Sequence, residues 1–182
     1  VVFRGYHNAP EATADAIAAD GWLHTGDIGR LEPGPMGNEL RVFDRKKDIM
    51  ITAGGKNITP SELENALRVS AYIKEAVVVA DRRRFVSALI QIDPESVGKW
   101  AEESGIAYTN YRSLAQLPRV RELIQQEIDL VNSRMPQVQH IRKFHLLTKE
   151  LDHDDGEVTA TMKVKRASIE AKYRDAIEEM YA

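Results

Sequence analysis

The chain has 182 residues, of which 43% are apolar and 29% charged. Its 25 basic and 28 acidic side chains leave a formal net charge of −3, which argues against a protein whose main task is to coat nucleic acid or an anionic membrane. It has no cysteine, so disulfide frameworks, thiolate zinc sites and cysteine nucleophiles are excluded. No apolar run approaches the roughly 18 residues that cross a bilayer, and no secretory signal is visible, so we expect a cytoplasmic protein.

The first 44 residues read as a small segment that buries too little to fold alone. Val1–Phe3 is typical of the end of a strand, and Pro10–Ala19 of an alanine-rich helix. Leu40–Phe43 follows a turn rich in glycine and proline and reads as the second arm of a hairpin. Because the chain opens on Val1 and not on Met, we expect it to be a piece of a longer polypeptide.

A charged run and a glycine pair separate this segment from the rest. Asp44–Asp48 is five consecutive charges and indicates a linker. After the apolar triplet Ile49–Ile51, Gly54 and Gly55 predict a tight backbone turn. Helix-start signals come next: Thr59 as the cap, a proline at the first helical position, and a glutamate that bonds back to the cap.

The remaining chain mixes strands and helices. Ile73–Ala80 and Phe85–Ile92 are rich in β-formers and predict a hairpin with a solvated basic tip, Arg82-Arg83-Arg84. One long helix is predicted over Pro118–Met135 from its apolar stripe, and Arg166–Tyr181 is predicted as the last helix. A further helix at 93–105, a strand at 144–147 and an acidic loop at 152–156 complete the list. The predicted class is α+β, a small β-sheet with a hairpin and flanking helices.

Two polar positions near the linker have the chemistry to bind a nucleotide. Asp27 follows a Thr-Gly turn, and its carboxylate can accept two hydroxyl protons from a vicinal diol such as a ribose. Arg45 can donate to a ribose or phosphate oxygen. Local physics leaves a second interpretation open for each, because Asp27 can simply stabilise its own turn and the charged run can be a solvated surface.

Two further clusters carry similar alternatives. Gly54 and Gly55 let the backbone lie close to a slender ligand, or form only a turn before the next helix. Lys163, on a loop with Lys165 and Arg166, can neutralise a developing negative charge, or simply flank a helix. The five histidines lack ligand spacing, so no metal-binding residues are predicted.

Taken together, four motifs resemble the C-terminal part of an AMP-forming acyl-CoA synthetase. They are GWLHTGD at 21–27, DRKKD at 44–48, ITAGGKNITPSELE at 51–64 and EVTATMKVKR at 157–166. This adenylate-forming superfamily includes luciferase and peptide-synthetase adenylation domains. The long insertion from Pro94 to Met135 and the TxTxKxKR helix start make the chain most similar to the long-chain fatty acid–CoA ligase branch.

The resemblance implies two domains and two half-reactions. Residues 1–44 would be the end of the large adenylation domain, and 45–182 the small C-terminal lid domain. ATP and a fatty acid would give acyl-AMP, and the CoA thiol would then displace AMP. Magnesium ligands are expected in the absent N-terminal large domain, which is the expected partner, so the fragment alone should be inactive. No nucleic acid is expected, and the resemblance allows a peripheral association with a membrane.

The resemblance also implies roles for individual residues. Asp27 would bind the ribose hydroxyls, and Arg45 would contact the same ribose or stabilise the linker. Lys47 would lie at the hinge, where many relatives have aspartate. Gly54 and Gly55 would line the pantetheine tunnel in the thioester-forming pose.

Lys163 matches the lysine that bridges the substrate carboxylate and the α-phosphate during adenylation. The usual glycine before this lysine is Met162 here. A hinge would let one domain present the lysine and then the glycine wall to the same site. Two other functions remain open: an acyl-AMP ligase that loads an acyl carrier protein, and a non-catalytic interaction module.

Overall fold

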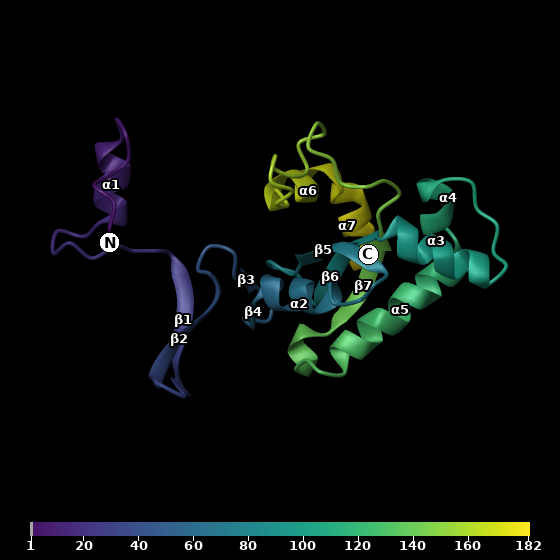
Figure 1. The fold of residues 1–182 in the computed structure, drawn as a ribbon, viewed down its shortest axis with the longest axis horizontal. Helices are drawn as coiled ribbons and strands as arrows, with labels where there is room; N and C mark the ends of the chain where they lie inside the picture. Colours follow the sequence, from purple (N-terminus) through teal and green to yellow (C-terminus); the bar gives the residue numbers. More distant parts are fainter. Residues whose placement is uncertain (1) are drawn as a thin grey trace. The chain divides into compact units, whose positions relative to one another are not determined.

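The computed structural model describes residues 2–182 and divides into two compact units, Val1–Ile49 and Met50–Ala182. The sequence-based boundary, between 44 and 45, lies a few residues earlier in the chain. The first unit contains α1 (Pro10–Ala16) and an antiparallel hairpin of β1 (Asp27–Gly34) and β2 (Gly37–Arg45) (Figure 1). The predicted hairpin is confirmed, although its arms are longer than expected.

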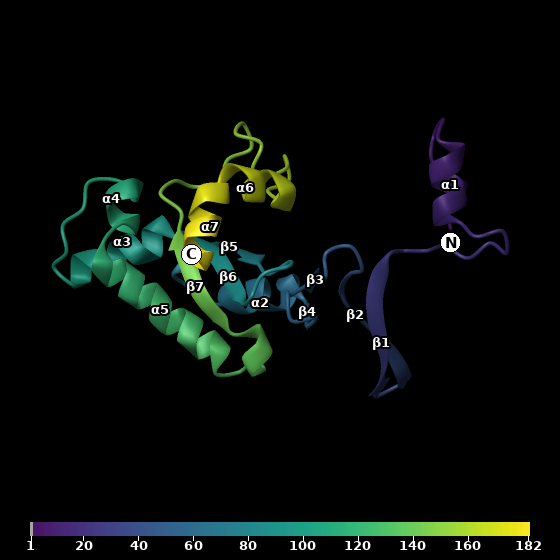
Figure 2. The same cartoon turned by 180° about the vertical axis from the view of Figure 1, so that it is seen from behind.

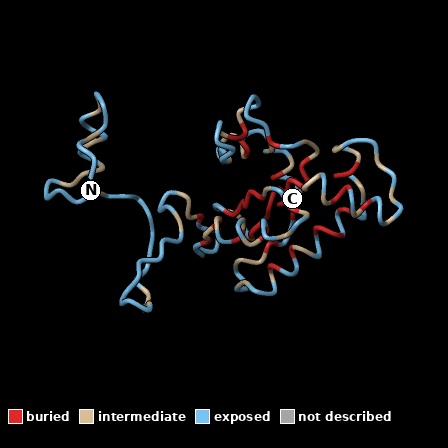
Figure 3. The backbone as a smooth tube through the Cα atoms, in the orientation of Figure 1, coloured by how far each residue is buried: buried red, intermediate tan, exposed pale blue. Residues whose placement is uncertain are grey.

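Two predictions for this unit are wrong in detail. The helix ends at Ala16 and not at Ala19, because Ile17 takes an extended backbone and forms a β-bridge with Leu23. Val1 lies outside the described residues, and Val2 and Phe3 are not in a strand. No residue between 2 and 49 is buried (Figure 3), so the described part of this unit has no core of its own.

The second unit is built on a three-stranded sheet in the order β5-β6-β7. β5 (Ile73–Val79) and β6 (Val86–Ile92) form the predicted antiparallel hairpin, while β7 (Ile141–Leu146) runs parallel to β6. The chain between β6 and β7 crosses over through the three helices α3 (Pro94–Glu103), α4 (Tyr111–Ala115) and α5 (Pro118–Asn132). Every residue of β6 is buried, as expected for a central strand covered on both faces.

Helices cover the two faces of this sheet and form two hydrophobic cores. α2 (Pro60–Leu67) and α3–α5 pack on one face, and α6 (Arg166–Lys172) and α7 (Arg174–Tyr181) on the other (Figures 1 and 2). The alternation of side chains along each strand divides the strand residues between the cores. Val78 and Ile90 belong to the first core, and Val77 and Leu89 to the second.

The helix predictions hold with three corrections. The α5 stripe is buried as predicted, but the helix ends at Asn132 and not at Met135. The last helix is two helices, separated at Tyr173, whose φ of −100° and ψ of 22° are not helical. The Tyr173 hydroxyl donates to Glu157 at 3.2 Å. The Thr59 side chain makes no capping hydrogen bond; its backbone carbonyl accepts from the Glu62 amide instead.

Some short elements were not predicted at all. β3 (Met50–Ile51) and β4 (Asn57–Ile58) pair across the glycine turn, and a single 3-10 turn covers Gln137–Gln139. Such short elements have too few residues for a period to be read from the sequence. No helix in the described chain is long and apolar enough to cross a membrane.

Candidate functional site

Hairpin pairing brings Asp27 and Arg45 together. The register of β1 and β2 sets these residues opposite each other, and Arg45 Nε lies 3.8 Å from Asp27 Oδ1. Two hydrogen bonds hold the backbone beside this pair: the Asp27 amide donates to Thr25 Oγ1 at 3.1 Å, and the Lys46 amide donates to the Gly26 carbonyl at 2.7 Å. Both charged side chains are exposed, so the pair adds little stability and leaves an acceptor and a donor for a ligand.

A hollow of about 560 Å³ lies beside this pair, within the first unit. It is lined by Thr25, Gly26, Arg45, Lys46 and Lys47. Lys47 is exposed and lies within a turn in which the Asp48 amide donates to the Arg45 carbonyl at 3.0 Å. Three cationic side chains around one hollow suit an anionic ligand.

The glycine turn lies in the second unit and is held at its base by backbone bonds. The Thr52 amide donates to the Lys56 carbonyl at 3.0 Å, and the Gly55 amide to the Thr52 carbonyl at 2.9 Å. The Ala53 amide donates to the Arg83 carbonyl, also at 2.9 Å, which ties the turn to the β5–β6 connection.

The two glycines of this turn are not equivalent. Gly55 has φ +71°, which side-chain-bearing residues rarely adopt. At Gly54, a Cβ would meet only Thr52 Oγ1, at 4.0 Å. The fold therefore requires glycine at 55 but leaves open space at 54.

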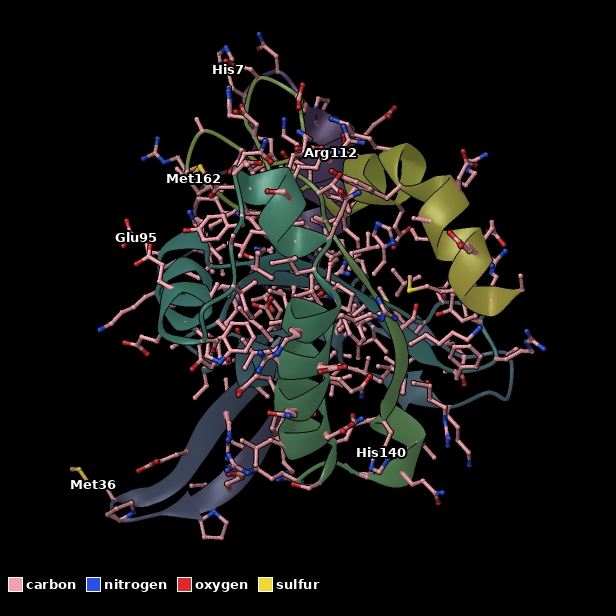
Figure 4. The ribbon with its side chains drawn as sticks, turned by 90° about the vertical axis from the view of Figure 1, so that its right-hand side faces the viewer. His7, Met36, Glu95, Arg112, His140 and Met162 are labelled. Atoms are coloured by element: carbon pink, nitrogen blue, oxygen red, sulfur yellow. The ribbon has the colours of Figure 1, made fainter. Side chains whose placement is uncertain are left out.

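A second tight turn carries Lys163. Val158 and Val164 form a β-bridge, and the Thr159 amide donates to the Lys163 carbonyl at 2.8 Å. The Lys163 amide donates to Thr159 Oγ1 at 3.0 Å. Met162, labelled in Figure 4, has φ +61° and is 61% exposed. Glycine adopts this left-handed backbone more readily than methionine does.

The cations around this turn have different surroundings. Arg166 faces the sheet, where its Nη1 donates to the Val78 carbonyl at 2.7 Å and its Nη2 to Glu64 Oε1 at 2.6 Å. Lys163 is exposed, and no carboxylate within residues 2–182 forms an ion pair with its ammonium. Of these two cations, Arg166 is paired with Glu64 and Lys163 is not paired with any described carboxylate.

The sequence predicts a solvated arginine-rich hairpin tip, but two of its three arginines contact α7. Arg83 forms an ion pair with Glu178, donating from Nη1 at 3.0 Å, and its guanidinium lies 4.8 Å from the centre of the Tyr181 ring. Arg84 donates to the Tyr181 carbonyl. Arg82 is 93% exposed, Arg84 is exposed as well, and Arg83 is partly buried. Nothing near 82–84 in the sequence predicts these contacts, because their partners lie about a hundred positions away in α7.

A buried charge cluster before the Lys163 turn was also missed. Glu157 is fully buried, with Lys149 Nζ at 2.8 Å from one carboxylate oxygen and Lys172 Nζ at 2.7 Å from the other. Asp155 pairs with both lysines. Burial would raise the pKa of Glu157, but the hydrogen bonds from the two lysines outweigh it and hold this pKa below its usual range. Burial of Tyr173, together with the neighbouring Glu157 charge, raises the pKa of the Tyr173 hydroxyl to about 12.

The structure therefore brings some predicted residues together and leaves others apart. Asp27 and Arg45 share one strand pair with Lys47 close by in sequence, while Gly54–Gly55 and Lys163 lie on two separate turns of the second unit. Across residues 2–182, no three His, Asp or Glu side chains lie close enough together to hold a metal ion.

The chain thus combines an α+β unit that carries a glycine turn and a lysine turn with a hairpin that pairs Asp27 with Arg45. Residues 47–182 match the family described as AMP-binding enzyme C-terminal domain. The chain belongs to this family.

The curated relatives are much longer than this chain. The long-chain-fatty-acid–CoA ligase FadD15 of Mycobacterium tuberculosis is 40% identical over 182 residues, which is all of this chain and 30% of that protein. The peroxisomal long chain acyl-CoA synthetase 7 of Arabidopsis thaliana is 32% identical over 185 residues, covering 100% of this chain and 26% of that protein. The chain thus spans about a third or less of the length of these relatives.

Solved structures resemble the whole fold. The adenylation domain of a carboxylate reductase from Mycobacterium chelonae aligns with a TM-score of 0.78 at 25% identity, covering 99% of this chain and 26% of that one. The corresponding domain from Segniliparus rugosus, solved with AMP and a co-purified carboxylic acid, has a TM-score of 0.77 at 21% identity and covers 99% and 26%. At these identities the second likeness shows the fold alone.

Proposed function

We propose that the chain is the C-terminal part of a long-chain fatty acid–CoA ligase. The parent protein activates a fatty acid with ATP to acyl-AMP, releasing pyrophosphate, and then transfers the acyl group to the CoA thiol, releasing AMP. The observation that carries the proposal is the 40% identity to a long-chain ligase over every residue of the chain. Residues 1–44 belong in this proposal to the large domain and 45–182 to a small domain that pivots near Lys47.

In the adenylation step, Lys163 supplies a cation where two anions meet. The fatty acid carboxylate must approach the α-phosphate, and negative charge builds up between them. An ammonium held in a site shielded from water stabilises that charge by several kcal/mol, in order of magnitude. The exposed ammonium of Lys163, free of any described ion pair, supports this role.

Asp27 and Arg45 bind the nucleotide in the same step. The Asp27 carboxylate accepts hydrogen bonds from the ribose hydroxyls, and Arg45 donates to the ribose from the opposite strand. Their pairing at 3.8 Å across the hairpin supports a shared ligand. Because Arg45 also lies beside Lys46 and Lys47, it connects the nucleotide site to the proposed pivot.

In the thioester step, Gly54 and Gly55 form the wall along which pantetheine reaches the acyl-AMP. A wall without side chains lets a slender thiol arm pass close to the backbone. Gly54 supports this role most clearly, because the fold leaves space for a Cβ there and so does not itself require glycine.

The decisive experiment measures the two half-reactions of the full-length parent separately. Lys163→Ala should reduce acyl-AMP formation, followed by pyrophosphate release, by about a hundredfold or more. Thioester formation from preformed acyl-AMP should change much less. Lys165→Ala, which removes a neighbouring exposed lysine, is the matched control and should leave both steps close to normal. Equal losses in both half-reactions for Lys163→Ala would contradict its role.

Gly54→Ala tests the opposite half of the cycle. It should slow thioester formation while leaving adenylation and the unfolding midpoint unchanged, since a Cβ at 54 meets nothing closer than 4.0 Å. Running the assay with CoA and with a carrier protein as acceptors separates the ligase from the carrier-loading alternative. Unimpaired transfer to CoA would exclude the glycine wall.

The isolated chain tests the last alternative, a non-catalytic module. Mixed with ATP and oleate it should release no pyrophosphate, because the acyl and triphosphate sites belong to the large domain. Adding the large domain as a separate chain should restore activity. Failure of restoration, with both parts folded, would favour an interaction module.

A further inference from the structure

The buried carboxylate of Glu157 lies directly before the turn that carries Lys163. Its oxygens accept from Lys149 Nζ at 2.8 Å, from Lys172 Nζ at 2.7 Å and from the Asp152 amide at 2.9 Å. The Tyr173 hydroxyl donates to it at 3.2 Å. A carboxylate with 0% side-chain exposure and four donors is held in one orientation, because a rotation would leave its own buried charge without these partners.

The backbone of Glu157 is part of the same turn. Its carbonyl accepts from the Lys165 amide at 2.9 Å, which closes the segment 158–164 at its base. The next residue, Val158, is buried in the second core and forms the bridge to Val164. The Glu157 side chain therefore connects the start of the turn to Lys172 in α6. Its backbone carbonyl connects the start of the turn to Lys165 at the end.

The far end of the turn is held in a comparable way. Arg166 opens α6 and is fixed by Glu64 and by the Val78 carbonyl at 2.6 and 2.7 Å. Between these two anchors Val158 is buried, whereas residues 159–165 are exposed or partly exposed. A short exposed tip on a rigid base can present one cation at a defined position, which loop mobility would otherwise blur.

We propose that Glu157 is a positioning residue for the adenylation step: by holding Lys149 and Lys172 it fixes the base of the turn that presents Lys163. The inference rests on the proposed function, in which Lys163 meets the reacting anions. In this proposal Glu157 touches no substrate, because its carboxylate is paired with Lys149 and Lys172 inside the protein. The cluster of Lys149, Asp155, Glu157 and Lys172 is charge-balanced, so neutralising Glu157 leaves an excess cation below the turn.

The test uses Glu157→Gln in the full-length parent enzyme with two readouts. Hydrogen exchange of peptides covering 158–165 should become faster by about tenfold, because the base of the turn opens more often. The kcat of acyl-AMP formation should fall by about tenfold with little change in the KM for ATP, since Lys163 is misplaced in the transition state and not in nucleotide binding. Thioester formation from preformed acyl-AMP should stay close to normal.

Ile177→Val is the matched control. Ile177 is buried in the same second core but does not belong to the charge cluster. This variant should lower the unfolding midpoint while leaving exchange in 158–165 and the adenylation kcat unchanged. If it slows adenylation as much as Glu157→Gln does, the effect of Glu157 is general destabilisation and the inference is overturned.

A second variant guards against misfolding. If Glu157→Gln does not fold, Lys172→Gln removes one of the two anchoring cations and leaves Glu157 paired with Lys149; the same selective loss of adenylation is expected, in a milder form. Faster exchange in 158–165 with normal adenylation overturns the positioning role, provided Lys163→Ala impairs adenylation. If Lys163→Ala has no effect, the proposed function fails instead, and the exchange data still decide whether Glu157 orders the turn.

Discussion

The ion pair between Arg166 and Glu64 gives the sharpest test of the packing described above. Arg166→Met keeps the length and much of the apolar stem of the side chain but removes the guanidinium. Two donated hydrogen bonds are lost, at 2.7 Å to the Val78 carbonyl and at 2.6 Å to Glu64 Oε1. The Glu64 carboxylate still accepts from the Val78 amide at 2.8 Å, so it loses the arginine but keeps one hydrogen bond.

The burial of the pair sets the size of the effect. The side chains of Arg166 and Glu64 are 28% and 12% exposed, between a surface pair and a fully buried one. Breaking surface pairs costs about 0 to 1 kcal/mol and breaking buried ones about 3 to 5 kcal/mol. We therefore expect a loss of about 2 kcal/mol in the free energy of unfolding. For a unit of this size the melting temperature should fall by about 8 °C.

Urea unfolding and calorimetry of the full chain measure both quantities. Arg82→Met is the control, because that side chain is 93% exposed and its loss should change the free energy of unfolding by less than about 0.5 kcal/mol. Glu64→Gln and the double variant complete a cycle whose coupling energy should exceed about 1 kcal/mol. A value for Arg166→Met no larger than that of the control would refute the view that this arginine anchors α6.

Three further outcomes are expected. The pKa of Glu157 in the folded protein is held below its usual value, so the ionised carboxylate contributes its full stabilisation of the fold above about pH 4.3. This contribution is lost as the pH falls through the folded pKa. Glu157→Gln should therefore reduce the loss of folding stability at acid pH. Burial lowers the pKa of His145; the Glu179 charge opposes this effect and the Arg121 charge adds to it. The NMR titration midpoint of His145 should therefore lie below about 6.5, and the free energy of unfolding should fall as the pH drops from that value. At Met162, with φ +61°, a β-branched valine should cost about 1 kcal/mol more than a glycine, measured by urea unfolding.

Each of these three has an outcome that contradicts it. An unchanged acid limb in Glu157→Gln would mean that this carboxyl is not the group that titrates. A His145 titration above its ordinary value would mean that the Glu179 charge dominates over burial. Equal stability of the valine and glycine variants at 162 would mean that the turn does not hold a left-handed residue there.

Local features of the sequence were enough to predict much of the second unit. The apolar stripe of 118–131 and the two β-rich runs around Asp81–Arg84 specify a helix and a hairpin, because burial on one face is written in the spacing of neighbouring residues. Asp27 and Lys163 differ from these elements, because local chemistry left a purely structural interpretation open for each of them. Their proposed roles came from the resemblance of the motifs that contain them.

Other features depend on partners far away in the chain, and only the tertiary structure revealed them. Three contacts join segments that no local period connects. They are the parallel pairing of β7 with β6, the ion pair of Arg83 with Glu178, and the hydrogen bond from Tyr173 to Glu157. The same holds for Glu157, which looks like part of an acidic loop in the sequence and is a buried anchor in the fold. The sequence by itself determined which groups can do chemistry; folding decided which of them are consumed by internal pairing and which remain free, because a charge excluded from water must find its partner wherever the chain brings one.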